Sequence, residues 1–149
     1  MIEVKNLVKK YGDHLAVDNI SFTVESGRIY GLLGPNGAGK STTMNIITGC
    51  LSATSGSVTV CGHDIFEEPK EAKKHIGYLP EIPPVYGDMT PYEYLTFVAE
   101  AKKVPSVRVA HDVREVMETT FLTDVSGRLI KNLSKGYKQR VGIAQAMVG

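Results

Sequence analysis

The stretch Gly34-Pro35-Asn36-Gly37-Ala38-Gly39-Lys40-Ser41-Thr42 decides how the rest of this sequence is interpreted. It fits the pattern G-x-x-x-x-G-K-[ST], in which glycines let successive backbone N–H groups face one anion. The lysine adds a full positive charge near the β- and γ-phosphates, and the next hydroxyl is a ligand for Mg²⁺. The pattern predicts a site for a nucleoside triphosphate. The alternative is a glycine turn that merely joins two elements.

The elements expected around this stretch provide the context that the pattern requires. Residues 28–33 (RIYGLL) form a short apolar run, typical of a strand buried on both faces of a parallel sheet. Residues 40–48 are expected to form a helix that ends at Gly49, and its N-terminus adds about half a positive charge at the phosphate site. Further strands are predicted at 2–10, 15–24, 55–62 and 75–80.

After residue 82 the pattern becomes helical. Residues 81–89 (EIPPVYGDM) form a Pro-rich linker, and Thr90, Pro91 and Glu93 then have the types and spacing of a capping box. A second helix is predicted after Ser106 and a third from Ser134. The residues expected on the buried faces of the three helices are Leu95, Val98, Ala99, Val109, Val113, Val116, Met117, Tyr137, Val141, Ala144 and Val148.

Composition limits the class of protein. The 149 residues suit about one domain, and 42% hydrophobic with 22% charged residues excludes a disordered chain. A formal charge of +1, without basic clusters interleaved with aromatic residues, argues against a nucleic-acid partner. Cys50 and Cys61 are too few for a disulfide framework and are expected to be buried thiols. No stretch approaches the roughly 18 apolar residues that would span a bilayer.

A second motif, LSKGYKQR at 133–140, makes the sequence resemble the nucleotide-binding subunit of the ATP-binding cassette (ABC) transporter family. It is similar to that family's signature sequence, GPNGAGKST at 34–42 is similar to the Walker A loop, and IGYLPE at 76–81 is similar to the Q-loop. The motifs stand in the family's order and cover nearly the whole chain. GYLPE together with LSKGY resembles a branch found mostly in bacterial exporters of the ABC-2 type.

The resemblance implies an α/β fold of the P-loop NTPase class, ABC type. Its parts would be an N-terminal antiparallel β subdomain, an incomplete P-loop sheet core and an α-helical subdomain. Residues 1–81 would form the β subdomain and P-loop core, and residues 82–149 the Q-loop linker and helical subdomain. Both would belong to the N-terminal part of one ATP-binding domain.

The resemblance also assigns an ATP site with Mg²⁺. Tyr11 would stack on adenine, although a Tyr-Gly pair is also an ordinary turn. Ser41 and Glu81 would hold the metal, and Lys40 with Glu81 would serve catalysis. The family usually has Gln at the position of Glu81, and a carboxylate there can ligate Mg²⁺ but repels phosphate. The nucleotide-binding residues implied are Tyr11, Val17, Gly34, Pro35, Asn36, Gly37, Ala38, Gly39, Lys40, Ser41 and Thr42.

The signature residues Ser134, Lys135, Gly136 and Tyr137 would act on the nucleotide of a second copy of the chain. Lys135 and Tyr137 replace the Gly and Gln of the commonest form. Ser134 and the Gly136 amide still offer donors to an anion. The alternative for Ser134 is a purely structural helix cap.

Hydrolysis needs further groups that this sequence lacks: an Asp closing an apolar strand after Lys40 and a carboxylate that positions water. In the family these follow the signature helix, so the chain is expected to be the first part of a longer ATPase, cut after the signature motif. The 149 residues would bind Mg-ATP without turnover, and strand 28–33 would expose an apolar face that promotes self-association. A non-hydrolytic nucleotide-binding regulatory fragment is the alternative.

The resemblance implies two protein partners, a second ATP-binding subunit, as a homodimer, and a transmembrane permease that Ile82 to Met89 would contact. The subunit would lie on the cytoplasmic face of the membrane. A family member acting on ribosomes or DNA would need a basic surface, which a charge of +1 does not supply. The four histidines have no carboxylate or second histidine at ligand spacing and are expected at ordinary surface or strand-end positions.

Overall fold

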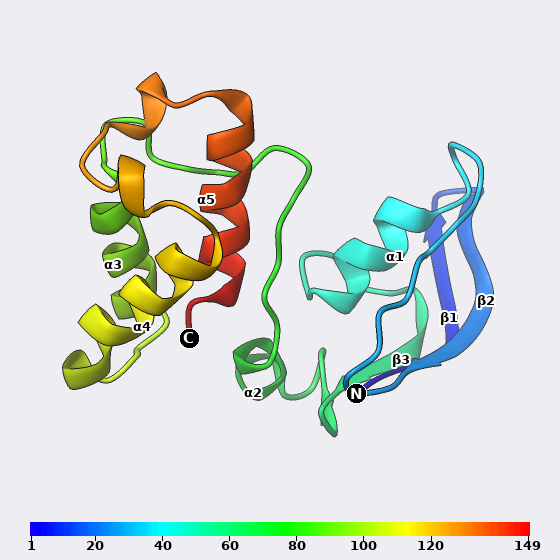
Figure 1. Cartoon of the computed structure of the whole chain (residues 1–149). Helices are drawn as coiled ribbons and strands as arrows, with labels where there is room; N and C mark the ends of the chain where they lie inside the picture. The colour runs from blue at the N-terminus through cyan, green and yellow to red at the C-terminus, as the bar shows by residue number, and fades with distance from the viewer. The chain divides into compact units, whose positions relative to one another are not determined.

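The computed structural model describes residues 1–149 and divides into two compact units, Met1–Ile76 and Gly77–Gly149 (Figure 1). The first unit contains all of the strands and the second contains only helices. No helix in either unit combines the length and the apolar character needed to cross a membrane. The assignment of 1–81 and 82–149 to two parts of one cassette stays a prediction.

The first unit is built on an antiparallel sheet. β1 (Ile2–Tyr11) and β2 (His14–Val24) form the predicted hairpin, in which Tyr11 pairs with His14. β3 (Ser55–Val60) pairs with the other edge of β1, and the short β4 (His63–Asp64) completes the order β2-β1-β3-β4. The predictions of strands at 2–10, 15–24 and 55–62 are confirmed within a few residues.

Two helices accompany the sheet. α1 (Lys40–Ile47) ends where expected, because Gly49 takes a left-handed φ of +67° just beyond the helix. α2 (Pro69–Lys74) was not predicted and is a short helix opened by a proline. Apolar faces of the sheet and of α1 together form the core of this unit, whose buried members are Val4, Leu7, Val17, Ile46, Ile47, Val58, Val60, Ile65 and Ala72.

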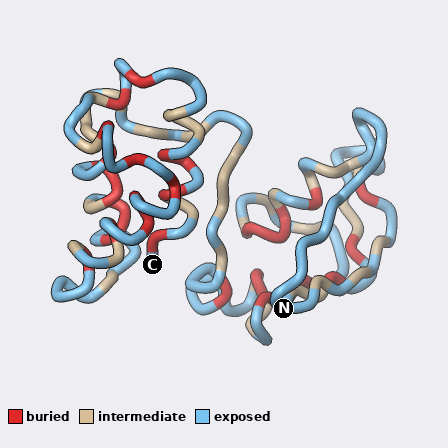
Figure 2. The backbone as a smooth tube through the Cα atoms, in the orientation of Figure 1, coloured by how far each residue is buried: buried red, intermediate tan, exposed pale blue.

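Two predicted strands do not form. Residues 28–33 lie in an irregular segment, and every residue from 25 to 38 is exposed (Figure 2). Residues 75–80 are also irregular after a turn at His75. A strand is stabilised by hydrogen bonds to its neighbours, and all four strands present pair with one another in the antiparallel sheet. The apolar run 28–33 therefore has no parallel sheet to enter.

The apolar run 28–33 exposes large side chains. Ile29 is 102% exposed and Leu33 is 91% exposed. Contiguous exposed apolar side chains favour association. We expect concentration-dependent self-association and binding of a hydrophobic dye by the 149-residue chain. Ile29→Glu should raise the dissociation constant about tenfold, since it removes an apolar side chain from the contact. Sedimentation velocity over a range of concentrations measures this.

Val107→Glu is the matched control, because Val107 is 88% exposed on a helix of the second unit. It should leave self-association unchanged. A monodisperse monomer without dye binding would contradict the expectation, and an equal effect of both substitutions would remove residues 28–33 as the cause.

The two thiols also differ from expectation, since Cys50 and Cys61 are both exposed and free. Cys50 follows the glycine that ends α1, and Cys61 occupies the β3–β4 turn with a φ of +50°. Turns lie at the surface, so the position in the chain outweighs the usual preference of cysteine for the interior.

The second unit is a helical bundle with its own core. It contains α3 (Pro91–Ala101), α4 (Ser106–Thr119), the 3₁₀ turns η1 (Thr123–Val125) and η2 (Ile130–Asn132), and α5 (Lys135–Met147). The predicted buried faces are confirmed, except that Tyr137 is only partly buried. The core members are Tyr94, Leu95, Val98, Ala99, Val109, Val113, Val116, Met117, Leu122, Val125, Ile130, Leu133, Val141, Ala144 and Val148.

The capping box at the start of α3 is confirmed. The Glu93 N–H donates to Thr90 Oγ1 over 3.3 Å, and the Thr90 N–H donates to Glu93 Oε2 over 2.8 Å. Hydrogen bonds from the Thr90 backbone and hydroxyl hold the pKa of the Glu93 carboxyl below its usual 4.5.

This lowered pKa predicts a pH dependence. A carboxyl whose pKa is lower in the folded state stabilises that state above pH 4.5, and the contribution disappears as the pH falls through the folded pKa. Glu93→Gln should therefore melt at a lower temperature than the parent chain at pH 7, and the difference should shrink in acid. Thermal melts followed by circular dichroism from pH 7 to pH 3 test this. A constant difference would contradict it.

Candidate nucleotide-binding site

The glycine-rich segment before α1 adopts an alternating backbone conformation. Gly37 and Gly39 have φ values of +84° and +82°, whereas Ala38 between them has no positive φ. The Ala38 N–H donates to Pro35 O over 3.3 Å and closes the turn. Alternation of left-handed and right-handed residues turns neighbouring N–H groups to one side, which makes a concave site for an anion.

The start of α1 supplies donors of its own. Gly39 is the N-cap residue and has no side chain, so no side-chain cap satisfies the first N–H groups of the helix. Ser41 and Thr42 lie in this first turn. An anion at this position would meet unpaired donors and the positive end of the helix dipole.

Lys40 lies over the same segment. Its ammonium donates to Gly34 O and to Pro35 O, each over 2.7 Å. These contacts hold the positive charge above the loop, and they include no carboxylate that would neutralise it. The site therefore has a positive charge that no carboxylate in contact with Lys40 neutralises.

The hairpin β1–β2 completes the site within the first unit. A Cβ added to Gly39 would lie 2.2 Å from Ala16 O and 3.2 Å from Val17 Cγ2, so β2 touches the helix start. Val17 is 5% exposed and belongs to the core of the first unit, so it is a fixed support for the loop residue Gly39. Tyr11, at the end of β1, is 49% exposed and offers an open ring face.

The signature residues occupy the start of α5 in the second unit. Ser134 is the N-cap, and its Oγ accepts a hydrogen bond from the Tyr137 N–H over 3.3 Å. A Cβ on Gly136 would meet nothing nearer than the Ser134 Oγ at 3.9 Å, so the backbone here is open to an approaching group. Lys135 is exposed.

Tyr137 makes contacts that the sequence did not indicate. Its hydroxyl donates to Asp124 Oδ2 over 3.2 Å, and the Arg140 guanidinium lies 5.1 Å from its ring centroid. Arg140 also lies 5.9 Å from the ring centroid of Phe121, and Phe121 has a left-handed φ of +55°. The contacts with Asp124 and Phe121 join different chain segments, whereas Tyr137 and Arg140 are three residues apart on α5.

Glu81, the other predicted metal ligand, is exposed and belongs to the second unit, whereas Lys40 and Ser41 belong to the first. A metal ion shared by Ser41 and Glu81 stays a prediction.

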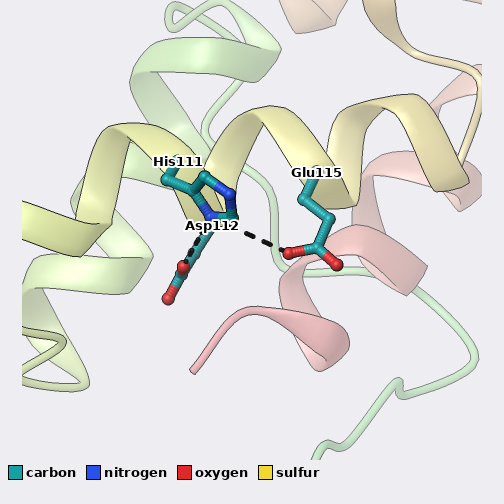
Figure 3. A group of neighbouring side chains, drawn as sticks. All are labelled: His111, Asp112 and Glu115. Atoms are coloured by element: carbon teal, nitrogen blue, oxygen red, sulfur yellow. Dashed lines mark hydrogen bonds and ion pairs between the residues drawn. The ribbon is translucent and has the colours of Figure 1, made fainter.

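The expectation that every histidine lacks a partner is wrong. On α4, His111 Nδ1 lies 3.3 Å from Asp112 Oδ1 and 3.9 Å from Glu115 Oε2, with the imidazole between the two carboxylates (Figure 3). Arg108 also pairs with Asp112 over 2.9 Å, and the side chains of His111 and Glu115 are 77% and 70% exposed. We assign this group to solvated ion pairs, because an arginine already neutralises the least exposed carboxylate.

Two histidines of the first unit also have partners that were not expected. His63 stacks on His75 at 5.9 Å between ring centroids, and His63 Nδ1 lies 3.3 Å from Glu68 Oε1. The residues are far enough apart in the chain that only the fold of β4 and α2 brings them together.

A glycine-rich loop at the start of a helix, backed by an antiparallel hairpin that carries an exposed tyrosine, is an arrangement suited to a nucleotide. The model of the ABC transporter family matches residues 17–149, and the chain belongs to that family.

Relatives support the same assignment. The chain is 38% identical over 148 residues to the ABC transporter ATP-binding protein YxlF of Bacillus subtilis, covering 99% of this chain and 48% of that protein. It is 36% identical to the bacitracin transport ATP-binding protein BcrA of Bacillus licheniformis, covering 99% of this chain and 47% of that protein. The chain thus spans about half the length of these curated relatives.

Solved structures show the fold. The ATP-binding subunit of an ABC transporter superposes with a TM-score of 0.87 at 28% identity, over 97% of this chain and 60% of that one. The cbiO1 protein of Clostridium perfringens gives a TM-score of 0.86 at 25% identity, over 99% of this chain and 61% of that one. The mixed α/β fold of ABC cassettes is confirmed, although strand 28–33 is not formed.

Proposed function

We propose that this chain is part of the ATP-binding subunit of an ABC transporter, and that it binds Mg-ATP at the loop 34–42. The observation that carries the proposal is the set of donors around Lys40. These comprise the Lys40 ammonium, which loop carbonyls hold, and the uncapped start of α1. Gly39 lies so close to β2 that a side chain there would have no room. A positive charge and hydrogen-bond donors, with no carboxylate bonded to that charge, suit the negative charge of a triphosphate.

In this proposal each part of the nucleotide has a partner in the chain. Adenine stacks on the open face of Tyr11, which is 49% exposed, and the phosphates accept from the loop amides and Lys40. The Ser41 hydroxyl would be a ligand of Mg²⁺, since this ion prefers oxygen ligands, and Glu81 stays a second candidate ligand. When bound, Mg²⁺ neutralises charge on the β- and γ-phosphate oxygens.

The whole protein would act as a dimer on a membrane partner. Ser134 and the Gly136 amide of one copy would donate to the γ-phosphate held by the other, which agrees with the open backbone at Gly136. The linker from Ile82 to Met89 would contact the permease on the cytoplasmic face of the membrane. Its exposed apolar residues support this, since Ile82 is 83% and Tyr86 is 53% exposed. Closure of the dimer on ATP would drive the membrane partner, and hydrolysis would reopen the dimer.

For the 149 residues alone we propose ATP binding without turnover. The two groups bonded to the Lys40 ammonium are the carbonyls of Gly34 and Pro35, and neither is a base that could accept a proton from an attacking water. A non-hydrolytic nucleotide-binding regulatory fragment is the alternative function, and it too predicts that the 149 residues bind ATP without turnover. A longer chain that hydrolyses ATP would exclude it.

Isothermal titration of the 149-residue chain with ATP, with and without Mg²⁺, tests the proposal. We expect saturable binding that Mg²⁺ strengthens, and no steady-state release of phosphate. Absence of binding to the folded chain would overturn the nucleotide site. Steady-state hydrolysis would overturn the proposal of binding without turnover.

A further inference from the structure

We infer that Lys9 is a positioning residue for Tyr11 and thereby sets the affinity of the chain for the base of the nucleotide. The Lys9 ammonium lies 5.1 Å from the centroid of the Tyr11 ring. It also donates a hydrogen bond to Ser52 O over 2.8 Å. The inference rests on the proposed function, because it assumes that adenine stacks on Tyr11.

Two other hydrogen bonds fix the segment that holds the ammonium. The Thr54 N–H donates to Val8 O over 2.9 Å, and the Lys10 N–H donates to Thr54 Oγ1 over 2.9 Å. They tie the segment between α1 and β3 to the end of β1. The Ser52 carbonyl is thus held in place. The Lys9 ammonium that it binds lies over the Tyr11 ring.

The position of Lys9 in the sheet relates it to the phosphate loop as well. Lys9 pairs with Val17 across the hairpin, and Val17 Cγ2 is the group that a Cβ on Gly39 would meet at 3.2 Å. Tyr11 lies at the end of the same strand, opposite His14. Lys9, which contacts the Tyr11 ring, therefore lies on the β1–β2 hairpin that also packs against the phosphate loop.

A held cation has two physical effects on the ring. It is attracted to the π-electrons, which restricts the rotation of a half-exposed side chain, so less entropy is lost when a base stacks. It also occupies one face of the ring and draws electron density from it, which leaves the other face for a flat aromatic base. When the base excludes water, the attraction between Lys9 and the ring grows stronger.

A different role must be separated from this one, because the Lys9 charge would also attract phosphates at long range. Inorganic tripolyphosphate carries the phosphates without the base. Positioning of Tyr11 predicts a loss for ATP and none for tripolyphosphate, whereas simple attraction predicts equal losses for both.

The test compares Lys9→Met with Lys10→Met, which removes the same charge from an exposed neighbour on the same strand. Titration with Mg-ATP should show about a threefold loss of affinity for Lys9→Met, no change for Lys10→Met and substantial recovery for Lys9→Arg. Binding of tripolyphosphate should be equal in all of them. In a Tyr11→Ala background, Lys9→Met should have no further effect, because the ring it positions is gone.

The outcomes separate the two proposals. If the parent chain does not bind ATP, the proposed function fails. If the parent chain binds ATP and Lys9→Met binds it equally well, only the inference about Lys9 is overturned. An equal loss for tripolyphosphate, or an undiminished loss in the Tyr11→Ala background, would also overturn it. Thermal melts of each variant check that the fold is kept.

Discussion

Gly39→Ala is expected to lower the free energy of unfolding of the first unit by about 2–5 kcal/mol. Two costs add. A left-handed residue with a Cβ costs about 1–2 kcal/mol, and Gly39 has a φ of +82°. The new Cβ would also lie 2.2 Å from Ala16 O, and forcing such an overlap costs about 1–3 kcal/mol.

Gly37→Ala is the matched control for this substitution. Its φ of +84° is nearly the same, but a Cβ there meets no atom within 4 Å. It should lose only the conformational part, about 1–2 kcal/mol. Urea denaturation of both variants measures the difference, which isolates the contact between β2 and the start of α1. Equal losses would show that this contact has no role in holding the loop.

Local chemistry made much of the fold predictable. The capping box at Thr90 and Glu93, the turn at Gly12 and the glycine that ends α1 each depend on residues within a few positions. The helical faces could be predicted as well, because a repeat near 3.6 residues selects one side of a helix whatever it packs against. The conformation of the loop 34–42 could also be predicted from nearby residues, since its positive φ values occur at its own glycines.

Strand 28–33 could not be predicted correctly from its own residues, because a buried parallel strand exists only when neighbouring strands pair with it. Ile29 and Leu33 have the side chains of such a strand, and both are exposed. The pairing of His63 with His75, and of Tyr137 with Asp124, depends in the same way on segments that approach only after folding.

Lys40→Ala is expected to weaken binding of Mg-ATP by about 10- to 100-fold, because a hydrogen bond from a charged donor contributes roughly 1.5–3 kcal/mol. In the structure the ammonium donates to Gly34 O and Pro35 O over 2.7 Å. A phosphate entering the loop would accept from the same group at the cost of rearranging these two contacts. Titration calorimetry with Mg-ATP measures the loss.

Lys40→Ala also removes the two hydrogen bonds from the ammonium to the loop carbonyls, so a loss of affinity could come from a changed loop conformation. Lys70→Ala, on the exposed part of α2, removes an equal charge without touching the loop and should leave affinity unchanged. Lys40→Met keeps much of the volume and should lose affinity as strongly as alanine, which separates charge from packing. If Lys40→Ala melts like the parent chain and still binds Mg-ATP equally well, the Lys40 ammonium does not bind the phosphates.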